Sequence, residues 1–285
     1  MFDYTLLDDI EIVLDLLNME EEDLAKEIGV TPMTIARWKE DESKVTISNL
    51  NDFYNFAYKK RIRINQIKEQ LFKEECPPNS TILFHGAKTS IEGNITLSKS
   101  KNKNDLGQAF YCGESLKQSA MFVSAYQESS LYILEFDKSN LNYVTLNVDR
   151  DWMLLIAYFR DRLSNYSNHP IIMNLLSKLT NKDYIIAPIA DNKMYEIIDS
   201  FIDGEITDVQ CQHCLSATSL GNQYVFKTHK ALSQIKILRH GFLSPLEKIH
   251  YLSSRQEESK INNDKVKIAR KLYRGQGEYI EEILK

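Results

Sequence analysis

Three segments that follow residue 80 carry polar and aromatic side chains that a buried strand does not need. The segments are LFHGAK, DLGQAFYCGESLKQSAMFVSAY and GNQYVFKTHKAL, and they contain His85, Tyr111, Phe122 and Gln223. An imidazole and a carboxamide can orient a ligand through hydrogen bonds, and two aromatic rings can stack on a planar group. A single histidine or aromatic residue is more often structural, so the case for a binding site depends on the order and spacing of all four.

Two cysteines have the spacing of metal ligands. Cys211 and Cys214 lie in CQHC, but the sequence has no second CxxC or HxxxH motif, and His213 is too close to both cysteines to complete a tetrahedral site. We therefore expect no metal and two ordinary thiols. Four cysteines are also too few and too scattered for a disulfide scaffold of this size, which agrees with a reducing compartment.

The length and composition predict a globular protein of about two domains. The chain has 285 residues, of which 43% are hydrophobic and 26% charged, so a wholly disordered chain is excluded. The net charge of −5 excludes a protein whose whole surface binds polyanions, and any contact with nucleic acid must be local.

The beginning of the sequence, MFDYTLLDDIEIVLDLL, has acidic residues where a secretory signal needs basic ones. No later segment approaches the roughly 20 apolar residues of a membrane span. We therefore expect no contact with a membrane and a cytoplasmic location.

A domain boundary is predicted at CPPNS, where two prolines interrupt a helical pattern. Residues 1–75 have apolar residues at helical spacing in five places, which cover 6–17, 21–28, 32–39, 48–57 and 63–73. Residues 76–242 alternate short β-branched and aromatic runs with helical patterns, and residues 243–285 form a charged tail with an amphipathic helix at Lys265–Tyr273. The predicted fold class is α+β, with an all-helical bundle followed by a mixed domain.

The first domain contains a helix-turn-helix signal in MEEEDLAKEIGVTPMTIARWKED. Gly29 marks the turn, and Thr31 before Pro32 is a good N-cap for the second helix. The segment resembles the phage-repressor-like helix-turn-helix family over residues 9–72. The resemblance implies that Thr31, Met33, Thr34 and Arg37 would face DNA.

The negative charge of this domain argues against strong binding to DNA. Residues 1–75 contain 10 basic and 17 acidic residues, a net −7, which leaves +2 for the rest of the chain. DNA-reading domains normally show a basic face. DNA binding and a role in protein interaction or dimerisation therefore both stay open.

The four residues of the later segments lie in a recognisable order. A strand with His-Gly precedes an aromatic strand, a helix with a second aromatic residue, and a late strand with a polar amide. This layout resembles the ADP-ribosyltransferase superfamily, in its diphtheria-toxin and poly-ADP-ribose-polymerase branch, whose signature is His, Tyr and Glu. That fold binds NAD in a cleft between two small sheets.

The chain is also similar to a bacterial family of poorly characterised transferase-like domains. Those domains share an HG strand, a DFG-x-GFY turn, a D-x-x-x-G-x-x-AD segment and an NQ strand. The matching pieces are LFHGAK, DLGQAFY, DYIIAPIAD and GNQYVFKTHKAL, in order, over residues 81–238.

The resemblance implies a role for each matching residue toward NAD. His85 would bond the adenosine-side ribose, and Gly86 would offer its backbone to the nicotinamide amide. Tyr111 and Phe122 would sandwich the nicotinamide ring, and Ser119 would contact its carboxamide.

Gln223 stands where the signature glutamate is expected. A neutral amide can orient a ribose hydroxyl but stabilises developing positive charge less well, which favours transfer of a single ADP-ribose and leaves an inactive binding domain open. Asp105 and Asp191 are further candidates near the ribose, and Arg160 could reach a phosphate of NAD. For Asp183, capping of a strand is the preferred interpretation.

The resemblance therefore implies a bacterial mono-ADP-ribosyltransferase that uses NAD as a substrate and modifies a macromolecular acceptor, either protein or nucleic acid. Such domains commonly act as toxins, which implies a neutralising antitoxin protein as partner. The alternative is a regulator in which a non-catalytic domain senses NAD or ADP-ribose, or binds a protein, beside a DNA-binding helix-turn-helix.

Overall fold

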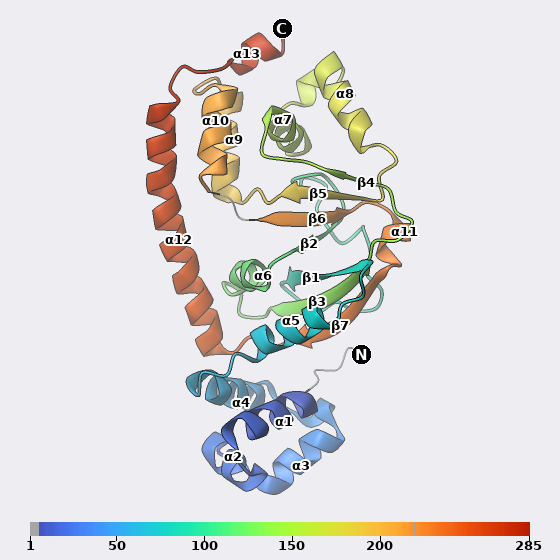
Figure 1. The fold of residues 1–285 in the computed structure, drawn as a ribbon, viewed down its shortest axis with the longest axis vertical. Coiled ribbons are helices and arrows are strands. Elements are labelled where there is room, and N and C mark those ends of the chain that lie inside the picture. The colour runs from blue at the N-terminus through green and yellow to red at the C-terminus, as the bar shows by residue number, and fades with distance from the viewer. Residues whose placement is uncertain (1–5, 219–220) are drawn as a thin grey trace. The chain divides into compact units, whose positions relative to one another are not determined.

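The computed structural model describes residues 6–218 and 221–285, which form two compact units (Figure 1). Unit 1 contains the chain as far as Asn94, together with Ser115–Asp137 and Ile235–Arg255. Unit 2 contains Ile95–Glu114, Lys138–Gln234 and Gln256–Lys285. An all-helical N-terminal region precedes a mixture of strands and helices, so the predicted α+β class is confirmed.

The first part of unit 1 is a bundle of five α-helices, and all five were predicted from the apolar pattern. They are α1 (Leu6–Leu17), α2 (Glu21–Ile28), α3 (Pro32–Glu40), α4 (Ile47–Lys59) and α5 (Ile64–Glu74), with a short 3₁₀ turn, η1 (Glu42–Lys44). Helices α2 and α3 form the predicted helix-turn-helix. Gly29 ends α2 with a φ of 76°, and the Thr31 hydroxyl accepts a hydrogen bond from Thr34 N at 3.2 Å.

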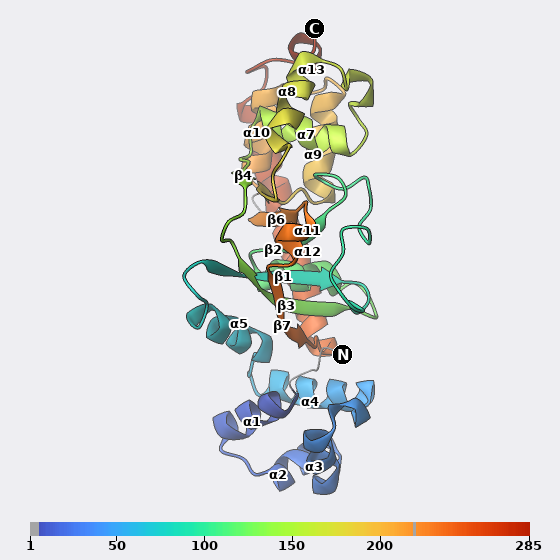
Figure 2. The same ribbon diagram turned by 90° about the vertical axis from the view of Figure 1, so that its right-hand side faces the viewer.

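Unit 1 continues with three antiparallel strands, β1 (Ser80–Ala87), β3 (Ser130–Asp137) and β7 (Ile235–Gly241). Strand β3 lies between the other two, and α6 (Leu116–Val123) contacts β1. Figure 2 shows the three strands side by side, with α1–α4 beyond β7. Four of the candidate site residues lie on β1 and α6.

A buried ionic network joins α1, α4 and β7. Arg239 and Asp9 form a salt bridge through two hydrogen bonds, and the Tyr54 hydroxyl donates to Asp9 Oδ2 at 2.5 Å. Asp9 is 0% exposed and Arg239 2%. Each charge therefore depends on its partner, because neither can be solvated by water.

A second buried acid makes the stability of the protein depend on pH. Burial raises the pKa of the Glu247 carboxyl to about 7, although Asn65 Nδ2 donates to both of its oxygens at 3.3 Å. The folded state therefore keeps a proton that the unfolded chain loses at about pH 4.3, and rising pH lowers the free energy of unfolding up to about pH 7. Glu247→Gln removes this titration. We expect the variant to gain about 2–3 kcal/mol over the wild type between pH 5 and 8.

This difference is measured by urea unfolding of both proteins at several pH values. Burial, with the nearby Arg239, lowers the pKa of His240 to about 4. His240 therefore makes the free energy of unfolding rise with pH, in the opposite direction to Glu247. The difference between variant and wild type therefore isolates Glu247. Glu257→Gln, at an exposed position, is the control, and its difference in stability from the wild type should not change with pH. A constant difference for Glu247→Gln would contradict the prediction.

Unit 2 has four strands, β2 (Phe110–Gly113), β4 (Tyr143–Thr145), β5 (Tyr184–Pro188) and β6 (Asn222–Phe226). Strand β4 is parallel to β5, whereas β5 with β6 and β6 with β2 are antiparallel. The other elements are α7 (Arg150–Phe159), η2 (Ser164–Tyr166), α8 (Pro170–Leu179), α9 (Asn192–Ile202), α10 (Asp208–Ser216), α11 (His229–Leu232) and α13 (Ile280–Ile283). The core contains Trp152, Ile198 and Phe201.

The C-terminal tail contains a helix that is much longer than predicted. Helix α12 spans Pro245–Leu272, whereas the sequence indicated a helix only at Lys265–Tyr273. Its apolar anchors are sparse, with Tyr251 in a core of unit 1 and Val266 and Ala269 in the core of unit 2. Polar and charged residues occupy most of the positions between them, which hides the apolar period that marks a helix.

Among residues 6–218 and 221–285, the structure contains no helix with the length and apolar character that a membrane span requires.

Candidate functional site

Four of the predicted NAD-binding residues lie together in unit 1. His85 and Gly86 are on β1, and Ser119 and Phe122 are on α6. A Cβ atom on Gly86 would come within 2.7 Å of Val123 Cγ1 and 2.8 Å of Ser119 O. The strand and the helix can therefore approach this closely only with a glycine at position 86. Packing thus accounts for Gly86 in addition to its predicted backbone contact with the nicotinamide amide.

The side chains of these four residues differ in their surroundings. The Ser119 hydroxyl is buried and donates to Phe84 O at 3.3 Å, whereas the Phe122 ring is 54% exposed. The half-buried His85 ring lies 6.4 Å from the Tyr132 ring, centroid to centroid. Phe122 thus presents an aromatic face to its surroundings, as a stacking residue requires.

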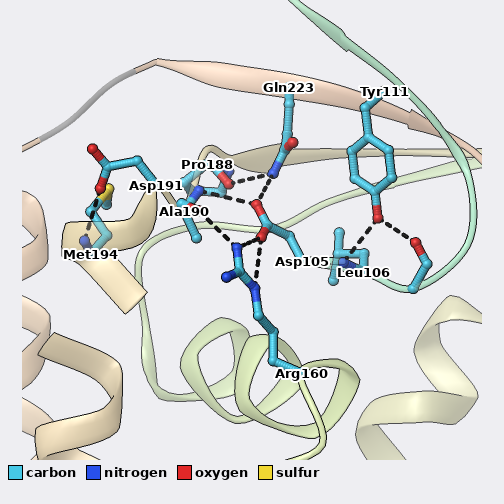
Figure 3. A network of polar contacts seen from close by, with 10 residues as sticks. Asp105, Leu106, Tyr111, Arg160, Pro188, Ala190, Asp191, Met194 and Gln223 are labelled. Atoms are coloured by element: carbon cyan, nitrogen blue, oxygen red, sulfur yellow. Dashed lines mark hydrogen bonds and ion pairs between the residues drawn. The ribbon is translucent and has the colours of Figure 1, made fainter. Parts of the chain in front are cut away.

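Unit 2 brings Tyr111 and Gln223 to one face of its sheet. In the β2–β6 pair, Gly113 is opposite Gln223 and Tyr111 is opposite Val225. Opposed residues share a face, and so do residues two positions apart on one strand, so Tyr111 and Gln223 point to the same side. Figure 3 shows both side chains directed toward the loop that carries Asp105.

Asp105 is at the centre of a buried polar network (Figure 3). Its Oδ2 atom accepts hydrogen bonds from Gln223 Nε2 at 3.0 Å and from Ala190 N at 3.3 Å. Its Oδ1 atom accepts from Arg160 Nε at 3.2 Å and also from Nη2 of the same guanidinium. Gln223 Nε2 donates in addition to Pro188 O at 3.2 Å.

Arg160 is fixed in this network rather than held ready for a ligand. It directly follows α7, donates to Ala190 O at 3.2 Å, and stacks over the Tyr195 ring at 4.4 Å. Its charge offsets that of Asp105, so the predicted contact with a phosphate would have to compete with an existing ion pair. The pairing of Arg160 with Asp105 was not predicted from the sequence.

The loop that carries Asp105 is held by two further side chains. The Tyr111 hydroxyl donates to Gly107 O at 2.6 Å and accepts from Leu106 N at 3.1 Å, and burial raises the pKa of Tyr111. Lys227 Nζ donates to Leu106 O at 2.9 Å, and desolvation lowers the pKa of Lys227. The position of the Asp105 carboxylate is thus set by side chains from β2 and from the residue after β6.

Tyr111→Phe tests whether the tyrosine hydroxyl holds the loop that carries Asp105. The variant keeps the aromatic ring but removes both hydrogen bonds, so we expect the free energy of unfolding to fall by about 1–3 kcal/mol. Urea unfolding measures the change. Tyr166→Phe, on a tyrosine that is 40% exposed, is the control and should change stability by less than about 0.5 kcal/mol. Equal effects of the two substitutions would show that the Tyr111 hydroxyl does not hold the loop.

The two other acidic candidates cap secondary structure. Asp191 is the N-cap of α9 and accepts from Met194 N at 2.8 Å, and Figure 3 shows it turned away from Asp105. Asp183 accepts from Asn142 N at 2.9 Å and from the Thr228 hydroxyl at 2.9 Å, and the bond from Asn142 lowers the pKa of Asp183. A role for Asp191 toward a ligand stays a prediction.

The CQHC motif lies on α10. Both thiols are buried, with Cys211 Sγ 3.6 Å from Ile197 O and Cys214 Sγ 3.8 Å from Val266 O, and burial raises the pKa of both. In the part of the chain that the structure describes, no group of three or more His, Cys, Asp or Glu side chains could hold a metal ion.

The predicted DNA-facing residues lie on or next to α3. Thr31, Met33 and Arg37 are exposed, and the half-buried Thr34 shares a hydroxyl–hydroxyl hydrogen bond of 2.9 Å with Thr31. A contact of these residues with DNA stays a prediction.

Comparison with known proteins gives a family for the second part of the chain. The family described as "Protein of unknown function (DUF3990)" matches residues 81–237, more than half of the sequence. The match begins within β1, the strand with His85, and ends in β7, so it includes His85, Gly86, Asp105, Tyr111 and Gln223. A search of curated proteins found no match.

Proposed function

The chain belongs to the DUF3990 family, and we propose that this member is an NAD-dependent mono-ADP-ribosyltransferase. One observation carries the proposal. Gln223 lies on the same sheet face as Tyr111, and its amide nitrogen is held by Asp105 and Pro188 while no donor among the described residues reaches its Oε1 atom. An aromatic ring beside an oriented, unengaged acceptor is the arrangement needed to hold a nicotinamide and a ribose hydroxyl.

In the proposed reaction, the bond between the nicotinamide nitrogen and ribose C1′ breaks, and its electron pair leaves with nicotinamide. The acceptor nucleophile forms a new bond to C1′ and releases its proton. Gln223 Oε1 would accept a hydrogen bond from the nicotinamide-side ribose and stabilise the positive charge that develops at C1′. Because the amide carries no full charge, most of the rate enhancement would come from positioning.

The remaining residues have supporting roles in the proposal. In unit 2, Tyr111 supplies an aromatic face for the nicotinamide ring. For unit 1, the resemblance implies a second aromatic face from Phe122 and contacts of Ser119 and Gly86 with the carboxamide. His85 holds the adenosine-side ribose. Asp105 acts through Gln223, and Asp191 would orient the acceptor nucleophile or supply negative charge near the ribose.

We further propose that the protein is a bacterial, cytoplasmic toxin whose partners are a macromolecular acceptor and a neutralising antitoxin protein. ADP-ribosylation of an essential component would explain why a cell needs such a partner. The antitoxin has to prevent NAD turnover, either by covering the site or by holding it in an unproductive state.

The acceptor is identified with NAD labelled in the adenylate phosphate. The full-length protein is incubated with a cell lysate, or with the same lysate treated with protease or nuclease. We expect label in one macromolecular class that disappears with the matching treatment. If calorimetry shows NAD binding but no label or nicotinamide appears, the protein is instead a regulator that senses NAD. If NAD does not bind, both functions are wrong.

The capped helix pair supports a second proposal, that the bundle binds DNA through α3. Arg37 is exposed beside Thr31 and Met33, so Arg37→Ala should weaken binding to the DNA upstream of the protein's own gene by about 10-fold. Mobility shifts at low and moderate salt measure the effect. Glu40→Ala, at the exposed end of the same helix, is a control that should not weaken binding. No shift with the wild type at low salt would leave protein interaction as the role of the bundle.

A further inference from the structure

We propose that Asp105 is a positioning residue that decides which atom of Gln223 faces the substrate. The inference rests on the proposed function, because it assigns a task to an amide in that same site. It also explains why a glutamine stands where related transferases have a glutamate.

The hydrogen bonds of Gln223 fix the direction of its amide. Both partners, Asp105 Oδ2 at 3.0 Å and Pro188 O at 3.2 Å, are acceptors without a proton to donate. Only the NH₂ end of the amide can satisfy them, and the flipped amide would place Oε1 against a carboxylate and a carbonyl oxygen. The amide oxygen must therefore point the other way, toward the side of Tyr111 in Figure 3.

The same contacts reject a glutamate at this position. Its carboxylate would lie about 3 Å from the Asp105 carboxylate and from Pro188 O, and two carboxylates at such a distance cannot both stay ionised. Gln223 thus offers the substrate an acceptor oxygen, as a glutamate would, at a position whose neighbours favour an amide over a carboxylate. The acidic residue of the site is Asp105, which lies behind the amide.

Arg160 and Ala190 make the carboxylate rigid. Arg160 occupies Oδ1 and Ala190 N bonds Oδ2, so Asp105 cannot rotate away from Gln223. Asp105 itself is 8% exposed. The orientation is therefore built into the protein before NAD binds, which lowers the cost of binding.

Reciprocal substitution tests the inference. We expect Asp105→Asn and Gln223→Glu each to lower kcat/KM for nicotinamide release by about 10- to 100-fold, the effect of one lost or repulsive charge-assisted hydrogen bond. The double variant restores a donor and an acceptor between positions 105 and 223, while the contacts with Pro188 O and Ala190 N stay unfavourable. It should be at least about tenfold more active than the product of the single effects predicts.

The pH profile separates positioning from a structural role. In the double variant the acceptor at position 223 is a carboxylate, and activity should fall on the acid side as that carboxylate is protonated, so the pH profile of the double variant should differ from that of the wild type. Asp161→Asn makes the same change in an exposed ion pair with Lys103 and should leave turnover unchanged. A double variant no better than the product of the singles overturns the inference.

A second readout does not depend on turnover. The side-chain amide protons of Gln223, identified by NMR through their absence in Gln223→Ala, should exchange slowly in the wild type and faster in Asp105→Asn. If the wild type does not turn over NAD but the amide is protected, the proposed function is wrong and the orientation stands. Rapid exchange in the wild type overturns the inference, whatever the turnover.

Discussion

Gln223→Ala should lower the rate of nicotinamide release from NAD by at least about 100-fold, the usual effect of removing one group that stabilises the transition state. The substitution removes the oriented Oε1 acceptor and leaves the Asp105–Arg160 pair in place, since that pair has its own hydrogen bonds. Because binding of NAD also uses other residues, we expect KM to change less than kcat. Initial rates over a range of NAD concentrations measure both constants.

Gln212→Ala is the matched control for this result. Gln212 is a half-buried glutamine of unit 2 whose Nε2 donates to Val148 O at 2.9 Å, so the substitution also removes one amide hydrogen bond. It should leave turnover within about twofold. If both alanine variants retain the wild-type rate, Gln223 is not part of the catalytic machinery.

Arg239→Met should lower the free energy of unfolding by about 3–5 kcal/mol, the largest stability effect that we expect. The variant leaves the Asp9 carboxylate, which is 0% exposed, with the Tyr54 hydroxyl at 2.5 Å and Lys68 Nζ at 4.0 Å as its remaining contacts. A buried carboxylate without its guanidinium is strongly unfavourable. Urea unfolding at pH 7 measures the loss.

Two comparisons make this prediction specific. The double variant Asp9→Leu/Arg239→Met removes both charges and should recover most of the stability, because apolar side chains can replace a buried pair. Lys44→Met breaks an exposed pair with Asp41 and should cost less than about 0.5 kcal/mol. A loss below about 1 kcal/mol for Arg239→Met would mean that water reaches Asp9.

The helices of the bundle were predictable because their signals are local. Thr31, Pro32 and Gly29 lie within one turn of the helix ends that they define, and buried residues such as Leu24 and Ile35 follow the helical period. Most strands were found for a similar reason, since β-branched and aromatic runs mark them, but β7 was not predicted. Helix α12 was underestimated because its few buried residues are too far apart to reveal a period.

The polar network of the site was only partly predictable. Asp105, Tyr111 and Gln223 were all candidates, but the contact between Asp105 and Gln223 joins residues 118 positions apart, which no periodicity indicates. The pairing of Arg160 with Asp105 across 55 positions was missed for the same reason. Asp191 had a local signal, an acid directly before a helix, and the structure shows it capping that helix.

The amide of Gln223 shows what the structure adds to a sequence pattern. In the sequence, a glutamine in place of a glutamate is a departure that leaves both an active and an inactive domain open. In the structure, Asp105 and Pro188 account for the amide by hydrogen bonding, so the glutamine fits its surroundings as an acid would not. This fit supports the hypothesis of an active transferase over that of an inactive binding domain, and a measurement of NAD turnover tests it.

The most direct test of the proposed function is the release of nicotinamide from NAD labelled in the nicotinamide ring. The wild-type full-length protein, incubated with NAD and a lysate, should release nicotinamide in a quantity equal to the ADP-ribose bound to macromolecules. The Gln223→Ala variant should release at least about 100-fold less. A wild type that releases no more nicotinamide than this variant would contradict the proposal that the protein is an ADP-ribosyltransferase.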